Sequence, residues 1–136
     1  MDTQELHDRG LKLRCELFGA AAVEQRASAL GEFGAPLQHI INAYAYGDVW
    51  QLPEVPLATK SLAMVAMMAA AARGPELRVH LRGALKNGCT PEQIREILLL
   101  VALYCGIPAA NDAHQAAVEV FAERAEASGP AKAPRP

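Results

Sequence analysis

The stretch that decides the fold class is residues 90–104, TPEQIREILLLVALY. Its first four residues form a capping box, in which Thr90 caps the first helical turn, Pro91 takes the first helical position and Gln93 reaches back to the cap. The apolar residues that follow recur at helical spacing until Gly106 provides a stop. This stretch therefore predicts an α-helix with a defined start.

On both sides of this helix, apolar residues recur at helical spacing, and no convincing run of alternating β-branched residues is found. The fold class is therefore predicted to be all-α, a bundle of about six to seven helices. The expected helices cover residues 5–18, 21–30, 36–46, 57–72, 76–87, 94–104 and 109–127. Trp50 and two prolines between residues 48 and 56 predict an ordered loop with one large apolar anchor. Gly74 is expected to take a positive φ after the 57–72 helix, and Pro75 to open the next helix.

The size of the chain predicts its domain organisation. A length of 136 residues with 51% hydrophobic content suits one domain around one core. We expect this single domain to cover residues 1–127. Residues 128–136 are rich in Pro, Ala and Lys, and they are predicted to form a disordered tail.

The charge balance excludes some classes of partner. Lys and Arg number 13 against 15 Asp and Glu, so the formal charge of −2 provides no basic field for nucleic acid. Residues 1–9 are polar and do not resemble a secretion signal. The longest apolar stretch, residues 57–72, contains Lys60 and is shorter than the ~20 residues that cross a bilayer. We therefore expect neither a nucleic-acid partner nor a membrane partner.

Cysteine usage predicts the compartment. The three cysteines, Cys15, Cys89 and Cys105, are odd in number and widely spaced. This pattern argues against a disulfide framework, a zinc knuckle and a dithiol redox centre, and it favours a reducing cytoplasm. The histidines likewise lack metal-ligand spacing, so no metal site is expected.

The 57–72 helix predicts self-association. Its apolar residues are spread over almost every face rather than along one stripe, so it needs neighbours all round. A chain this small has few helices to supply them. We therefore expect a homo-oligomer in which another subunit provides part of the cover.

His80 is the strongest candidate for proton transfer. Glu76 lies four residues earlier, so both side chains share one helix face. The carboxylate can orient the imidazole and raise its pKa, which makes His80 a candidate proton donor near neutral pH. The alternative is a surface pair on a solvated helix. Val79 and Leu81 beside His80 favour partial burial.

Several cations and aromatic residues are candidates for binding an acid. Lys60, Arg73, Arg78 and Arg82 can each pair with a substrate carboxylate, and the alternative for each is a solvated helix surface. The large amphipathic rings are Trp50, Tyr44, Tyr46 and Tyr104, which serve either as core residues or as a ligand platform.

Four stretches together carry a resemblance to a known family: FGAPLQHIINAYAYGDVW (33–50), ELRVHLRGALKNG (76–88), TPEQIREILLL (90–100) and YCGIPAAN (104–111). They resemble the carboxymuconolactone decarboxylase family over nearly the whole chain except the tail. The resemblance implies an all-helical fold shared with alkylhydroperoxidase-type thiol peroxidases, assembled as trimers or hexamers. That branch uses a Cys-x-x-Cys pair ahead of its histidine. Arg73 and Glu76 stand at those positions here, so the redox pair is absent and His80 remains.

The resemblance also implies a reaction: decarboxylation of 4-carboxymuconolactone to 3-oxoadipate enol-lactone in the aerobic breakdown of protocatechuate, the β-ketoadipate pathway. No cofactor is implied, because electrons released with carbon dioxide flow onto the conjugated lactone carbonyl. The implied catalytic residues are His80, as oxyanion donor or general acid, and Glu76, which orients it. The implied substrate-binding residues are Lys60 or Arg73 for the retained carboxylate, with Trp50, Tyr46, Leu37 and Tyr104.

The sequence also departs from the family pattern. The family commonly has Trp where Tyr46 stands, and often an Arg-rich run where residues 56–60 read PLATK. Fewer cations would weaken the binding of a doubly charged substrate. Two alternatives therefore stay open: another proton-transfer reaction on a lactone, such as isomerisation or hydrolysis, and a non-catalytic oligomer that binds a small acid.

Overall fold

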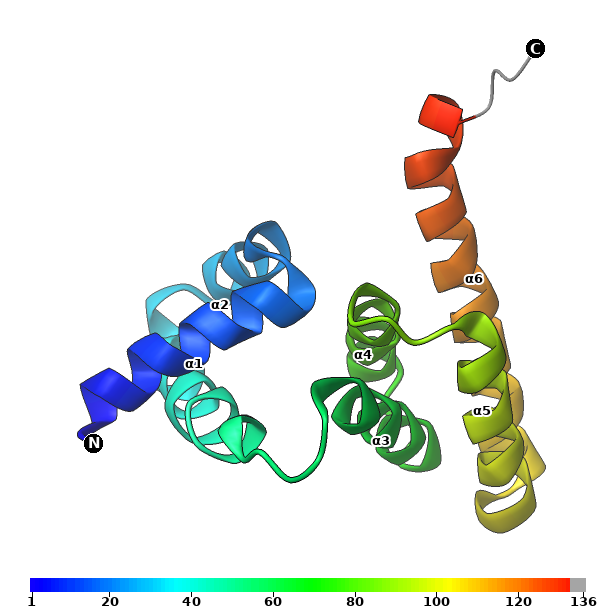
Figure 1. The fold of residues 1–136 in the computed structure, drawn as a ribbon, viewed down its shortest axis with the longest axis horizontal. Coiled ribbons are helices and arrows are strands. Elements are labelled where there is room, and N and C mark those ends of the chain that lie inside the picture. The colour runs from blue at the N-terminus through cyan, green and yellow to red at the C-terminus, as the bar shows by residue number, and fades with distance from the viewer. Residues whose placement is uncertain (133–136) are drawn as a thin grey trace. The chain divides into compact units, whose positions relative to one another are not determined.

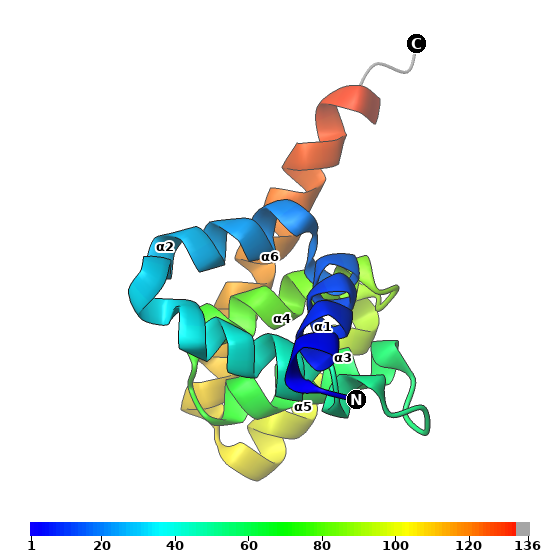
Figure 2. The same cartoon turned by 90° about the vertical axis from the view of Figure 1, so that its left-hand side faces the viewer.

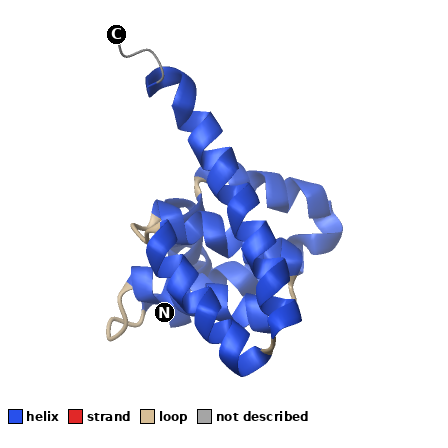
Figure 3. Ribbon diagram, turned by 90° about the vertical axis from the view of Figure 1, so that its right-hand side faces the viewer, coloured by secondary structure: helices blue, strands red, loops and turns tan. Residues whose placement is uncertain are grey.

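The computed structural model describes residues 1–132, and every regular element among them is helical (Figures 1 and 3). The α-helices are α1 (Thr3–Phe18), α2 (Ala20–Ile40), α3 (Leu57–Ala70), α4 (Gly74–Lys86), α5 (Pro91–Cys105) and α6 (Ile107–Lys132). A π-helix, η1 (Ile41–Tyr46), and a 3-10 helix, η2 (Val49–Gln51), lie between α2 and α3. The predicted all-α class is confirmed.

The chain divides into two compact units, Met1–Lys60 and Ser61–Pro136. The first holds α1, α2, η1 and η2, and the second holds most of α3 together with α4, α5 and α6. A single domain over residues 1–127 stays a prediction.

In the first unit, α1 packs directly against η1, and Figure 2 shows α1 beside the segment that follows α2. Two glycines permit this contact. A Cβ atom on Gly10 would overlap the carbonyl oxygen of Asn42, and one on Gly47 would overlap the carbonyl oxygen of Leu6. Because backbone meets backbone at both points, neither position has room for a side chain.

The region between residues 20 and 46 differs from the expected pair of helices. Gly31 has φ 59° and ψ −152°, which breaks α2 where a helix was expected to end. Pro36, expected to open the next helix, instead lies inside it, so its missing N–H costs one hydrogen bond close to the break. The final turn is π-helical, a geometry that apolar spacing does not distinguish from an α-helix.

In the second unit, α6 packs against both α4 and α5. Leu81, Ile94, Leu98 and Val120 are fully buried there. The capping box predicted for α5 is confirmed: the Gln93 backbone N–H donates to Thr90 Oγ1 at 3.1 Å, and the Thr90 N–H donates to Gln93 Oε1 at 2.9 Å. Within residues 1–132, no helix is both long enough and apolar enough to cross a membrane.

Two boundaries in this unit differ from expectation. The positive φ after α3 lies at Ala72 (57°) and not at Gly74, because the N–H groups of Ala72 and Arg73 return to the carbonyls of Ala69 and Met68 and close the helix earlier. Pro75 opens α4 as predicted. α6 continues to Lys132, into the stretch assigned to the tail. Residues 133–136 of that predicted tail lie outside the described residues.

Candidate functional site

His80 lies on the buried face of α4. Its side chain is 7% exposed, and Leu77, Leu81 and Ala84 are the buried apolar residues nearest to it on that face. The alternative of a solvated surface histidine is therefore wrong. Glu76, one turn earlier, is exposed in the first turn of the same helix. Its role in orienting His80 stays a prediction.

The other candidates in the second unit are more exposed. Arg73 is the exposed N-cap residue of α4, and it lines a cavity of about 290 Å³ together with Leu77, Arg78 and Asp112. Arg78 forms an ion pair with Glu119. Tyr104 is 83% exposed near the end of α5, so it belongs to the surface rather than to the core.

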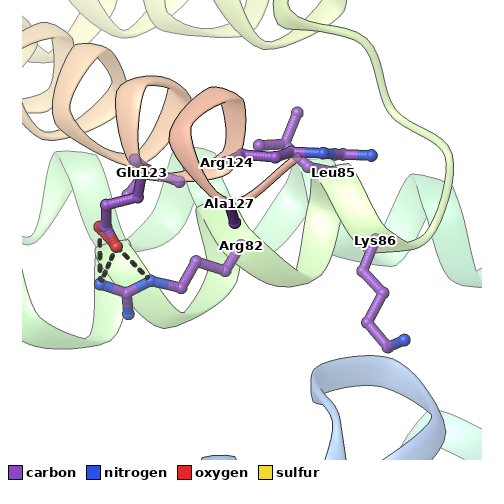
Figure 4. Close-up of a pocket in the computed structure, with 7 residues that line it drawn as sticks. Arg82, Leu85, Lys86, Glu123, Arg124 and Ala127 are labelled. Carbon is purple, nitrogen blue, oxygen red and sulfur yellow. Dashed lines mark hydrogen bonds and ion pairs between the residues drawn. The ribbon is translucent and has the colours of Figure 1, made fainter. Parts of the chain in front are cut away.

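A second cavity in this unit, of about 380 Å³, lies between α4 and α6 (Figure 4). Arg82 and Glu123 form an ion pair at its wall, whereas Lys86 extends away from them (Figure 4). Because Glu123 pairs with Arg82 and both side chains are half exposed, the charge of Arg82 itself contributes little to the binding of an anion in this cavity.

In the first unit, the structure brings Tyr46 and Trp50 together. Their rings stack with centroids 5.3 Å apart, and both residues are buried. Phe18 meets the Tyr46 ring edge-on at 5.8 Å. Leu37, expected on the same apolar wall, is half exposed on α2. The aromatic pair is thus part of the core of this unit, and a substrate contact through it stays a prediction.

Burial raises the pKa of Tyr46 to about 12, although the nearby charge of Arg14 opposes the shift. An unfolded tyrosine ionises near pH 10. The folded state therefore retains its proton more tightly, and this contribution to stability is complete below pH 10 and is lost as the pH rises through 12. We expect the free energy of unfolding to fall by about 3 kcal/mol over that range. Absorbance titration should show a tyrosine ionisation near pH 12 that Tyr46→Phe abolishes. An ionisation that persists unchanged in Tyr46→Phe would contradict the assignment to Tyr46.

Lys60 is engaged by backbone carbonyls. Its Nζ donates to the carbonyl oxygens of Trp50 at 3.0 Å and Leu52 at 2.6 Å. The ammonium group therefore satisfies two carbonyl oxygens at the end of η2 and holds the start of the following loop in place. One of its three N–H donors remains for another acceptor. Its role as the cation that holds a substrate carboxylate stays a prediction.

The first unit contains a buried polar cluster that the sequence patterns do not predict. Arg14 is 9% exposed, and its Nη1 donates to Gln38 Oε1 at 2.8 Å and to Asn42 Oδ1 at 3.0 Å. The guanidinium carbon also lies 5.7 Å from the centroid of the Tyr46 ring. Helical spacing contained a signal for Arg14, because it shares a face of α1 with Gly10 and Leu17. No local pattern indicated that Gln38 and Asn42 would meet it.

Two imidazoles lie beside this cluster. The rings of His7 and His39 stack with centroids 5.2 Å apart. His7 Nδ1 lies 3.3 Å from Asp8 Oδ1, and His7 Nε2 lies 3.3 Å from Asn42 Nδ2. His7 therefore bridges the carboxylate of Asp8 and the side-chain amide of Asn42. In the described part of the chain, no group of three or more His, Cys, Asp or Glu residues could hold a metal ion.

Comparison with known proteins identifies relatives over most of this chain. Residues 35–119 match the carboxymuconolactone decarboxylase family. A 4-carboxymuconolactone decarboxylase of Acinetobacter baylyi is 37% identical over 121 residues, which cover 89% of this chain and 90% of the relative.

Two further relatives have different names. The nitrosuccinic acid decarboxylase npaB of Metarhizium robertsii is 36% identical over 110 residues, covering 81% of this chain and 77% of that protein. Peroxisomal protein 2 of Schizosaccharomyces pombe is 42% identical over 81 residues, covering 56% of this chain and 38% of that protein. The family match spans most of the chain and includes α4 with its buried histidine. This chain therefore belongs to the carboxymuconolactone decarboxylase family.

Proposed function

We propose that this chain is a carboxy-lyase that decarboxylates 4-carboxymuconolactone or a closely related unsaturated lactone acid without a cofactor. The products are 3-oxoadipate enol-lactone and carbon dioxide. The observation that carries the proposal is the 37% identity to a 4-carboxymuconolactone decarboxylase over nine-tenths of that protein. The npaB relative is also a decarboxylase by name, which supports the reaction class more strongly than the substrate.

The chemistry of the substrate explains why a small helical protein suffices. When carbon dioxide leaves, the bonding electrons pass through the double bond to the lactone carbonyl oxygen. The protein then has to stabilise this oxyanion and deliver a proton to carbon. It also has to hold the leaving carboxylate in a poorly solvated environment, which favours loss of its charge.

His80 is the residue proposed for the proton and oxyanion steps. Its burial supports this role, because hydrogen bonds in a water-poor environment stabilise a developing charge more than exposed ones. Glu76 is the proposed positioning residue. Tyr46 and Trp50 are proposed as apolar wall, and Lys60 or Arg73 as the cation for the carboxylate that remains.

Assembly as a homo-oligomer, a trimer or a hexamer, is part of the proposal. Large apolar residues on α5 and at the start of α6 support it, since they are exposed in the single chain. They are Leu99, Leu100, Leu103, Tyr104 and Ile107. Apolar surface that is this continuous along a helix favours burial against a second subunit. The cytoplasmic location stays a prediction.

The direct test is an assay with 4-carboxymuconolactone that measures carbon dioxide and enol-lactone in the same sample. We expect equal amounts of both products. Consumption of the acid without carbon dioxide would replace the proposal with isomerisation or hydrolysis. Release of carbon dioxide from nitrosuccinate alone would retain the reaction class and overturn the lactone substrate. No turnover of either acid would contradict the enzyme assignment.

A further inference from the structure

A cavity of about 420 Å³ lies entirely within the first unit, where α1, α2 and η1 surround it. Its polar lining includes Arg14, Gln38, Asn42, His7 and His39. Leu11, Val23 and Ala27 supply part of its apolar lining. The volume falls in the range of small-molecule sites, and a few convergent polar groups among apolar walls are typical of such sites.

The guanidinium of Arg14 is a buried cation that forms no ion pair with any carboxylate among the described residues. Its hydrogen-bond partners, the amide oxygens of Gln38 and Asn42, are neutral. Among the described residues, none of the ion pairs involves Arg14. Burial lowers the pKa of Arg14, and the charge of Arg26 lowers it further. A buried charge of this kind is costly unless an anion accompanies it.

Arg14 also has donors left for a ligand. Both of its hydrogen bonds come from Nη1, so Nε and Nη2 retain their N–H groups. In the described part of the chain, no fully buried side-chain nitrogen or oxygen lacks a hydrogen-bond partner. Nε and Nη2 therefore remain accessible rather than sealed in the core. Together they present the edge of the guanidinium that pairs with both oxygens of a carboxylate.

We propose that this cavity binds the carboxylate group of a small organic acid, with Arg14 as the charged anchor. Gln38 and Asn42 hold the guanidinium in place, and the apolar lining receives the body of the acid. The stacked imidazoles of His7 and His39 form the adjacent polar wall. The lining of this cavity contains none of the residues proposed for catalysis or substrate binding, so this is a further site. The proposal rests on the proposed function only for the choice of a lactone acid as ligand.

Glu24 is the internal competitor for Arg14. It lines the same cavity, but its side chain is exposed and forms no ion pair with Arg14. If Glu24 moves toward the guanidinium in solution, Glu24→Gln should strengthen ligand binding. If the cavity is already free, that variant should leave the affinity unchanged or slightly stronger. A ligand whose affinity falls on Glu24→Gln does not bind as an anion to Arg14, so that result would overturn the proposal.

The probe is γ-carboxy-γ-butyrolactone, a saturated lactone acid that lacks the conjugated electron sink and is not decarboxylated. Its uncharged methyl ester is the matched control ligand. The measurement is NMR of the full-length protein labelled at arginine Nε. The Arg14 Nε–H resonance is the one that disappears in Arg14→Gln. We expect it to shift when the acid is added and to stay in place when the ester is added. This experiment involves no turnover. Binding at Arg14 can therefore fail while decarboxylation is demonstrated, and binding can be demonstrated while decarboxylation fails.

Calorimetric titration of variants provides the quantitative test. Arg14→Gln is expected to weaken binding of the acid at least tenfold, because it removes a charge-assisted hydrogen bond to the carboxylate. Arg14→Lys should retain part of the affinity, which separates ligand binding from unfolding. Lys12→Gln, which removes an exposed cation from the same helix, is the matched control and should bind like the parent. Equal binding by Arg14→Gln, or a ligand that leaves the Arg14 resonance unmoved, would overturn the proposal.

Discussion

Replacing Gly10 by alanine is expected to destabilise the first unit severely. The new Cβ would overlap the Asn42 carbonyl oxygen and would crowd the backbone nitrogen of Gly47. Backbone atoms cannot change rotamer, so α1 has to move away from η1. That movement opens the contacts of Arg14 with the residues around it. Overpacking a core with one methyl group costs about 1–3 kcal/mol, and we expect the upper end of this range or more.

Urea unfolding followed by far-UV circular dichroism measures this effect. Lys12→Ala is the matched control, because it introduces alanine at an exposed position of the same helix. Alanine and lysine both favour the α-helix, so this control should change the stability little. Equal stabilities of Gly10→Ala and the parent would show that α1 and η1 do not pack backbone against backbone in solution.

Substitution of His80 is expected to have the largest effect on activity. General acid–base groups contribute about 100- to 10,000-fold to a rate, and His80→Ala should lower kcat within that range if the proposed reaction is correct. His80 is buried, so the truncation also leaves a small cavity. His80→Gln retains much of the volume and a hydrogen-bonding group, and it should lose activity while folding like the parent.

His114→Gln is the control for removing a histidine from this unit. His114 is half-buried on α6, and its Nδ1 contacts the carbonyl of Ala110 on the same helix at 2.7 Å. This variant should keep its kcat. The His80 and His114 variants are compared by steady-state kinetics, and a thermal melt of each protein checks that it is folded. Full turnover by His80→Gln would remove His80 from the mechanism, whatever the substrate proves to be.

The part of the fold that local sequence patterns predict is the part stabilised by local interactions. The α5 capping box was predicted because Thr90 and Gln93 act within one turn. The positive φ at Ala72 was missed, because Gly74 has the intrinsic preference and only the closing hydrogen bonds of α3 decide which residue takes it. An alanine held there carries a conformational cost of about 1–2 kcal/mol.

The candidate site likewise has features that the sequence predicts and features that it does not. His80 was identified from its neighbours along one helix and from the family resemblance, and both are visible in the linear sequence. Its partial burial also followed from Val79 and Leu81. The exposure of Leu37 and Tyr104 was not predicted, since apolar and aromatic residues at helical spacing give no information about which face has a partner.

By itself, the sequence determined the all-helical class, the capped start of α5, the position of His80 in a helix and the family resemblance, because each depends on residues a few positions apart or on a continuous pattern. Tertiary structure alone decided that Arg14 is buried with Gln38 and Asn42, that Lys60 is engaged by the carbonyls of Trp50 and Leu52, and that Gly10 has to be glycine. The physical reason is that hydrogen bonding and steric exclusion depend on distances of a few ångströms between segments. Residues 24 and 28 positions apart reach such distances only when the chain is folded.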